Sequence, residues 1–259
     1  MSSVAQIIKS NKQQGRKTLI GYFPAGFPTF DESLEACVTM CNSGVDILEL
    51  GVPYSDPVMD GPVIQEATEI ALANGFKLRQ VFDLVGELTK RVSTPILVMT
   101  YWNPVIQYGV RKFAEDLKAA GGSGLITPDL IVDEAGAWLS VSDELGLERV
   151  FLATPSSSQE RVNRVAEVSR GFVYAVSTMG ITGAREDLDA AARQVVAKVR
   201  SAKPDQNVAV GIGISTAAQV AEVNTYADGT IVGSVFVRSY REGGISALAS
   251  VTRELSSQN

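Results

Sequence analysis

Short apolar runs rich in β-branched residues alternate along the chain with longer segments whose apolar residues recur every three to four positions. The runs are typical of buried β-strands and the longer segments of amphipathic helices. Eight runs are present, at 18–23, 46–50, 95–101, 123–129, 149–153, 171–176, 207–213 and 228–233. Helices are predicted between them at 31–44, 62–75, 78–92, 110–122, 133–146, 158–170, 187–202 and 215–227, and outside them at 3–15 and 245–257.

Eight strands alternating with helices are the order of a closed (β/α)₈ TIM barrel. We therefore predict such a barrel, with an extra N-terminal helix and a short helix after the eighth strand. A doubly wound open sheet is the alternative, but no Gly-rich dinucleotide motif follows the first strand. Since no linker or low-complexity stretch interrupts the pattern, we expect residues 1–259 to form a single catalytic domain.

Composition narrows the possible chemistry. The 259 residues carry a net charge of −6, and the basic residues are scattered, which argues against nucleic acid or an anionic membrane as a partner. The chain has no histidine, which excludes a Ser-His-Asp triad, a Cys-His pair and histidine-based zinc sites. Proton transfer must therefore use carboxylates, Tyr, Lys, Cys, backbone groups or water, and we predict no metal site.

The remaining sequence features point to the cytoplasm. Cys37 and Cys41 have the spacing of helix neighbours, and buried thiols in a reducing compartment explain them better than a disulfide or a metal. No apolar run reaches the roughly 18 residues that cross a bilayer. The N-terminal segment also lacks the charged-then-apolar layout of a signal peptide.

The segment LELGVPYSDPVMDGP, residues 48–62, places two acids at the end of the second strand and in the loop after it. In a barrel of this kind the chemistry lies at the carboxyl ends of the strands, so Glu49 and Asp60 would both face the mouth. Two carboxyl groups in different environments can divide acid and base roles. The structural alternatives are an interior salt bridge for Glu49 and a helix cap before Pro62 for Asp60.

Glycines cluster on the last three loops, in STMGITGAR (177–185), GIGIS (211–215) and VGSVFV (232–237). Glycine lets backbone N–H groups approach an anion, and a helix that begins at Gly233 and Ser234 would direct its positive end inward. A phosphate site on the last two loops is a recurring feature of this fold. Tight turns at strand ends are the simpler alternative, although three such clusters favour phosphate.

Apolar and aromatic side chains follow several of the predicted strands. They include Tyr22 and Phe23, the run from Met99 to Trp102, and Phe172 with Tyr174. Most such residues belong to the core. Those that face the mouth could accommodate a flat apolar group of a substrate.

Taken together, these motifs resemble the tryptophan synthase α subunit family. The resemblance extends over nearly the whole chain, through GYFPAGFP (21–28), LELGVPYSDPVMDGPVIQ (48–65), MTYWNPV (99–105), PDL (128–130), STMGITGAR, GIGIST (211–216) and VGSVFV. It implies a barrel that cleaves indole-3-glycerol phosphate to indole and glyceraldehyde 3-phosphate in a reversible retro-aldol reaction. The resemblance further implies that no metal or organic cofactor takes part on this chain.

The resemblance also implies a role for particular residues. Glu49 matches the general acid/base that protonates the indole C3, and Asp60 matches the residue that accepts the indole N–H. Thr182 lies on the loop that closes over the substrate. The matching phosphate-binding and substrate-lining positions are Gly183, Gly213, Gly233 and Ser234, and Tyr22 and Tyr174.

The family's partner is a pyridoxal-phosphate-dependent β subunit in an αββα assembly, which receives indole through a tunnel. The positions that match its contact region are Pro53, Asp56, Asn103 and Pro104. The alternatives are a stand-alone indole-3-glycerol phosphate lyase and a non-catalytic barrel that binds a phosphorylated ligand. A Schiff-base aldolase is disfavoured because no predicted strand carries a lysine.

Several positions depart from commoner patterns of the family. Pro24 stands where many members have a threonine, so it supplies no hydroxyl to Asp60. Ile131 and Val132 stand where a proline is often found, and Thr178 replaces an arginine of some members. None of these departures falls on Glu49, Asp60 or the glycines of the phosphate site.

Overall fold

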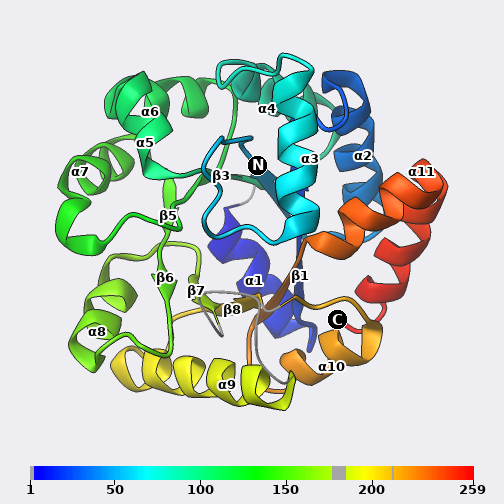
Figure 1. Ribbon diagram of the computed structural model, residues 1–259. Coiled ribbons are helices and arrows are strands. Elements are labelled where there is room, and N and C mark those ends of the chain that lie inside the picture. The colour runs from blue at the N-terminus through cyan, green and yellow to red at the C-terminus, as the bar shows by residue number, and fades with distance from the viewer. Residues whose placement is uncertain (1–2, 177–184, 212) are drawn as a thin grey trace.

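The computed structural model describes residues 3–176, 185–211 and 213–259 and contains one all-parallel sheet. Its strands lie in the order β5-β4-β3-β2-β1-β9-β8-β7-β6. The helices form a ring around the strands (Figure 1). The strands are β1 (Thr18–Pro24), β2 (Ile47–Gly51), β3 (Ile96–Met99), β4 (Gly124–Ile126), β5 (Glu148–Val150), β6 (Leu152–Ala153), β7 (Val173–Val176), β8 (Val208–Gly211) and β9 (Gly229–Val232).

The nine strands are the eight predicted ones with the fifth divided in two. β5 pairs with β4 and β6 pairs with β7, and between them Phe151 accepts a hydrogen bond from the Tyr174 N–H at 3.0 Å. The sheet therefore returns upon itself as a (β/α)₈ barrel, and the predicted TIM-barrel fold is confirmed.

The helices follow the predicted order, with one addition. α5 was not predicted; its sequence, WNPVIQY, begins in the aromatic run after the third strand. Pro104 is its third residue, where the missing N–H costs no helical hydrogen bond. The helices are α1 (Val4–Gln13), α2 (Phe30–Asn42), α3 (Pro62–Ala73), α4 (Gln80–Arg91), α5 (Trp102–Tyr108), α6 (Val110–Ala119), η1 (Val132–Glu134), α7 (Gly136–Leu145), α8 (Gln159–Val168), α9 (Arg185–Ala202), α10 (Ala217–Asn224) and α11 (Ser234–Ser256).

α11 combines the two helices predicted after the last strand. Its backbone leaves the helical region at Gly243 and Gly244, so a first segment that begins at Ser234 is followed by a terminal segment. Gly244 has a φ of 62°, which glycine adopts without strain. In the described part of the chain, no helix combines the length and the apolar character required to cross a membrane.

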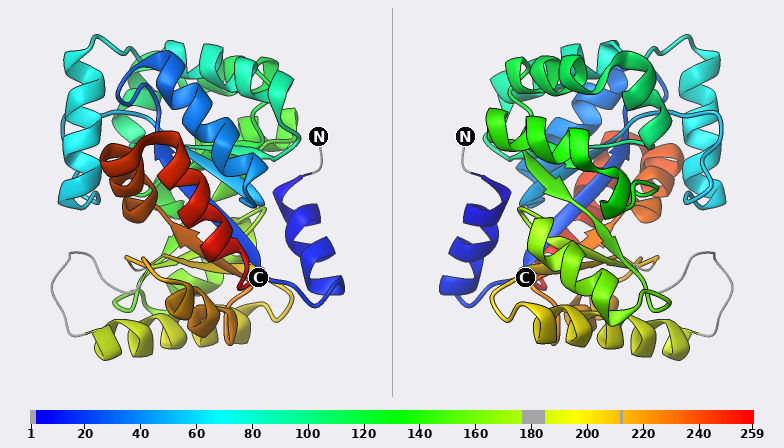
Figure 2. Two further views of the ribbon diagram at one scale, coloured as in Figure 1. Left: turned by 90° about the vertical axis from the view of Figure 1, so that its right-hand side faces the viewer. Right: turned by 90° about the vertical axis from the view of Figure 1, so that its left-hand side faces the viewer.

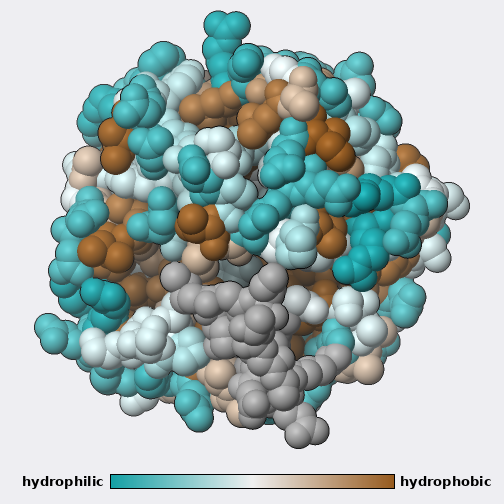
Figure 3. All heavy atoms as spheres, in the orientation of Figure 1, coloured by the Kyte–Doolittle hydropathy of each residue, from teal (hydrophilic) through white to brown (hydrophobic). Residues whose placement is uncertain are grey.

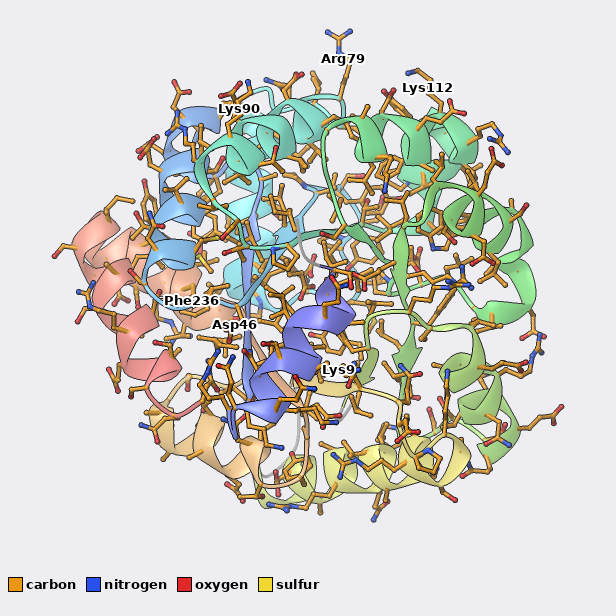
Figure 4. The ribbon with its side chains drawn as sticks, turned by 180° about the vertical axis from the view of Figure 1, so that it is seen from behind. Lys9, Asp46, Arg79, Lys90, Lys112 and Phe236 are labelled. Carbon is orange, nitrogen blue, oxygen red and sulfur yellow. The ribbon has the colours of Figure 1, made fainter. Side chains whose placement is uncertain are left out.

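The barrel interior is filled at one end by the N-terminal helix. Figure 2 shows α1 and α3 at opposite ends of the barrel, and Figure 4 shows α1, which carries Lys9, across the end where Asp46 precedes β2. Val4 and Ile8 of α1 pack against one inward-facing residue from most of the strands. α1 therefore closes the amino-terminal end and leaves the carboxyl-terminal end as the mouth.

The strand pleat decides which β2 residues face the interior. Side chains alternate between the two faces of a strand. Ile47 belongs to the interior cluster, whereas Leu48 and Leu50 pack against the surrounding helices. Glu49 consequently faces the barrel interior, beside Tyr22 of β1 and Leu97 of β3 in the strand register.

Candidate active site

A cavity of about 600 Å³ opens at the carboxyl ends of the strands. The face of the molecule that carries it is seen in Figure 3, where the centre is hollowed. Seven of the predicted catalytic, phosphate-binding and substrate-lining residues line it together: Tyr22, Glu49, Asp60, Tyr174, Gly213, Gly233 and Ser234. Two others, Thr182 and Gly183, and the departure at Thr178 lie outside the described residues.

Glu49 is an acid without a balancing charge. Its side chain is 2 % exposed, and within the described ranges its Oε2 has no hydrogen-bond partner and the carboxyl forms no ion pair. Burial, and second the nearby Asp60, raise the pKa of Glu49 to about 8. The group is therefore mostly protonated at neutral pH and can donate a proton into the cavity. The interior salt bridge considered from the sequence is not what the structure shows.

Asp60 lies in a different environment. Its side chain is partly buried, and α3 begins after Gly61 without a side-chain cap, so Asp60 does not serve as the cap considered from the sequence. Burial raises the pKa of Asp60 to about 6, against the opposing effect of a hydrogen bond from Tyr101. The two carboxyl groups thus differ in proton affinity, as an acid and a charged acceptor require.

The Tyr101 hydroxyl is a polar group of the site that the sequence did not single out. It accepts a hydrogen bond from the Met59 N–H at 2.9 Å and contacts the neighbouring Asp60 carboxyl. In the sequence Tyr101 belongs to the run from Met99 to Trp102, which indicated core packing or contact with a flat apolar group but no polar role. The useful signal was its place directly after a barrel strand.

The positive end of α11 faces the cavity. Gly233 is its N-cap residue and provides no side-chain cap, so the first N–H groups remain available to an anion. The start of α10 differs, because the Gln219 side chain accepts hydrogen bonds from the N–H groups of Ser215 and Thr216. Gly213 has a φ of 66°, and a Cβ there would meet no atom within 4 Å, so the loop after β8 leaves space beside α11.

Two tyrosines flank the carboxyl groups. Burial and the charges of Asp60 and Glu49 raise the pKa values of Tyr22 and Tyr174, which therefore remain protonated phenols. Their hydroxyls lie against glycine backbone at Gly51 and Gly211. Apolar side chains complete the wall, which suits a flat ring: Ile64, Met99, Ile126, Leu152, Val176, Ile214 and Ile231.

The predicted partner-contact residues lie outside the cavity. Pro53 is buried, Pro104 is partly buried, and Asp56 and Asn103 are exposed on the loop after β2 and on α5. Exposed apolar side chains occur on the same segments, with Val58 79 % and Ile106 53 % exposed. Among the described residues, no group of three or more Cys, Asp or Glu side chains could hold a metal ion.

The structure shows where two of the departures from the family pattern lie, at Pro24 and at Ile131 with Val132. Pro24 is buried and supplies no hydroxyl, and the neighbouring group that lowers the pKa of Asp60 is the Tyr101 hydroxyl. Ile131 is 40 % exposed on the loop after β4, next to the partly buried Val132.

Known proteins resemble the chain over its whole length. Residues 8–258 match the family model described as tryptophan synthase alpha chain. A tryptophan synthase alpha chain of Leifsonia xyli is 58% identical over 98% of this chain and 97% of its own length, and one of Mycobacterium avium is 50% identical over 98% and 93%. A solved structure of Mycobacterium tuberculosis tryptophan synthase superposes with a TM-score of 0.93 and 47% identity, over 100% of this chain and 98% of that one.

Proposed function

The chain belongs to the tryptophan synthase alpha chain family, and from this premise we propose that it cleaves indole-3-glycerol phosphate to indole and glyceraldehyde 3-phosphate. The observation that carries the proposal is Glu49, a buried carboxyl group in a cavity shared with Asp60, with one oxygen that has no partner among the residues the structure describes. One domain, residues 1–259, performs the reaction. The pyridoxal phosphate of tryptophan synthase belongs to the β subunit, and no cofactor is needed on this chain.

The reaction uses Glu49 first as an acid and then as a base. Its proton passes to C3 of the indole ring, which leaves a positive charge on the ring system. The bond between C3 and the glycerol carbon then breaks, and its electron pair neutralises that charge. The hydroxyl on the departing carbon becomes the aldehyde carbonyl, and its proton returns to the Glu49 carboxylate.

Asp60 stabilises the charged intermediate. Its carboxylate accepts the indole N–H, which becomes more acidic when C3 is protonated, so this hydrogen bond strengthens toward the transition state. A pKa of about 6 keeps Asp60 mostly charged at neutral pH, while Glu49, with a pKa of about 8, keeps its proton. Tyr22, Tyr174 and Thr182 line the indole and glycerol portions.

The substrate phosphate binds at the start of α11. Gly233 and Ser234 present the N–H groups at the start of the helix, which have no acceptor within the helix, and Gly213 lets the loop after β8 approach. Gly183 supplies a further backbone group. This anchor places the scissile bond near Glu49, because α11 and β2 border the same cavity.

The partner is the tryptophan synthase β subunit, expected in an αββα assembly in the cytoplasm. Pro53, Asp56, Asn103 and Pro104 form the contact. The support for this placement is that the loop after β2 and α5 follow the carboxyl ends of neighbouring strands and both carry exposed apolar residues. One of these residues, Val58, also borders the cavity, so indole released there has a short path to a partner bound to this loop.

The test is cleavage of indole-3-glycerol phosphate by the purified chain, with and without a β subunit. We expect cleavage that the partner accelerates, and a loss of at least about 10²-fold in Glu49→Gln with little change in phosphate affinity. A full rate unchanged by the partner would instead identify a stand-alone lyase. Phosphate binding with no cleavage under any condition would identify a non-catalytic binding barrel.

A further inference from the structure

The Tyr101 hydroxyl holds the loop that carries Asp60. Tyr101 follows β3, is the N-cap residue of α5, and is 2 % exposed. Its oxygen accepts the Met59 N–H at 2.9 Å, and the hydroxyl lies close enough to the Asp60 carboxyl group to lower its pKa. One phenol group thus fixes the backbone directly before Asp60 and borders the Asp60 side chain.

Tyr101 is itself held by the loops after the two neighbouring strands, β2 and β4. Its ring packs on Tyr54, from the loop after β2, with centroids 5.2 Å apart and planes inclined by 31°. The next residue, Trp102, donates its N–H to Asp129 Oδ1 at 2.8 Å, from the loop after β4. Asn103 Nδ2 donates to the Tyr54 hydroxyl at 3.2 Å. The hydroxyl therefore has a defined position before any substrate arrives.

We propose that Tyr101 is a positioning residue for the cleavage reaction, which orients the Asp60 carboxylate toward the indole N–H. The inference rests on the proposed function. A carboxylate that rotates among several conformations must be ordered before it can stabilise the transition state, which costs part of the hydrogen-bond energy. A carboxylate that is already oriented avoids this cost.

The surroundings of Asp60 leave this task to Tyr101. The groups that face Asp60 are Glu49 from β2, Tyr22 from β1, Tyr174 from β7 and Tyr101, and Asp129 lies beyond Tyr101. Over the described residues, none of these groups is a cation, and Tyr101 is the group that lowers the pKa of the carboxyl. Burial and the other neighbours favour the protonated, neutral form of Asp60, whereas Tyr101 favours its charged carboxylate.

The experiment compares Tyr101→Phe with Tyr108→Phe in the assembled enzyme. Phenylalanine at 101 keeps the ring against Tyr54 and removes only the hydroxyl. Tyr108 lies on the same helix, and its hydroxyl bonds Asp116 away from the cavity, so it is the matched control. The measurements are kcat and KM across pH, and the affinity for glycerol 3-phosphate as a probe of the phosphate site.

We expect Tyr101→Phe to lower kcat by about tenfold to a hundredfold, as loss of a hydrogen bond to a charged group does. Loss of the donor raises the pKa of Asp60, so the acid limb of the kcat/KM profile should move to higher pH. Glycerol 3-phosphate affinity should stay unchanged, and Tyr108→Phe should behave as the unmodified enzyme.

Two results would overturn the inference while the proposed function stands. In the first, Tyr101→Phe changes neither kcat nor the acid limb of the pH profile. In the second, kcat falls and glycerol 3-phosphate binds more weakly, but the acid limb does not move. The second would identify a purely structural role. Failure of the unmodified enzyme to cleave indole-3-glycerol phosphate would instead refute the function itself.

Discussion

Asp60 raises the pKa of Glu49, and the two carboxyl groups border one cavity. Burial is the larger cause of the shift, and the charge of Asp60 is the second. The Tyr101 hydroxyl lowers the pKa of Asp60, whereas Glu49 Oε2 has no hydrogen-bond partner among the described residues. The asymmetry keeps the proton on Glu49 near neutral pH.

Asp60→Asn should lower the pKa of Glu49 below about 8, because the amide removes the negative charge that opposes ionisation. The pKa should remain above 4.5, the ordinary value, since burial persists. Carbon-13 NMR of labelled glutamate carboxyl groups, followed across pH, measures the shift. Asp56→Asn is the control, because Asp56 is exposed on the same loop and should leave Glu49 unchanged. An unmoved Glu49 titration in Asp60→Asn would show that burial alone sets its pKa.

Glu49→Gln should change how stability depends on pH. The folded state holds the Glu49 proton up to about pH 8 and the unfolded chain only to about 4.5. Between these values the folded state binds more protons, so this contribution to stability is present below pH 4.5 and is lost as the pH rises to 8. The loss is about 4–5 kcal/mol.

Urea unfolding at pH 5 and pH 8 tests this expectation. Glu49→Gln should be more stable than the unmodified chain at pH 8, and the difference should shrink at pH 5. Glutamine cannot ionise, so it avoids the cost of a buried charge. Equal pH dependence in the two proteins would mean that Glu49 does not ionise in the folded state over this range.

The barrel and its mouth were predictable because they follow from periodic patterns. β2 illustrates this, since the placement of Glu49 inside the barrel depends only on strand alternation and on strand direction. The division of the fifth strand at Phe151 was not predictable, because it reflects pairing of its two parts with strands on opposite sides.

The polar contacts that hold the site loops, such as the one between Tyr101 and Met59, were harder to predict from the sequence than the two carboxyl groups. Tyr101 reaches Met59 across 42 positions of sequence, and no local pattern encodes a contact of that separation. The seven-residue α5 was missed for a related reason, because it is too short to show helical periodicity and contains Pro104. Both features depend on tertiary packing.

Gly51→Ala should displace Tyr22 from the wall of the cavity. An alanine Cβ at position 51 would lie 2.2 Å from the Tyr22 hydroxyl oxygen, which is too close to be accommodated without movement. Gly51 is fixed within β2, so the ring must move. We expect a raised KM for indole-3-glycerol phosphate and a loss of about 1–3 kcal/mol in stability.

Gly86→Ala is the matched control for that substitution. Gly86 lies inside α4, and a Cβ there meets no atom within 4 Å. Alanine should therefore stabilise the helix by about 0.5–1 kcal/mol and leave the steady-state constants unchanged. If Gly51→Ala kept the original KM and stability, the contact between Tyr22 and Gly51 would not shape the cavity.

Glu148 should anchor α1 at the closed end of the barrel. Its carboxylate accepts the N–H groups of Val4 at 2.8 Å and Ala5 at 3.0 Å, the first two residues of the helix. These N–H groups have no partner within the helix, and a negative charge at this end is favourable. Val4 and Ile8 are fully buried in the barrel interior, so the position of α1 determines how that end is filled.

Glu148→Ala should destabilise the protein by about 1–3 kcal/mol, since it leaves buried N–H groups unpaired. Glu148→Gln, which retains one acceptor oxygen, should lose less. Urea unfolding measures both, and amide hydrogen exchange should quicken in α1 before it changes in β2. Glu144→Ala, which breaks an exposed pair with Arg111, is the control and should have little effect. If Glu148→Ala matched this control in stability and in α1 exchange, the apolar contacts of Val4 and Ile8 alone would hold the helix in place.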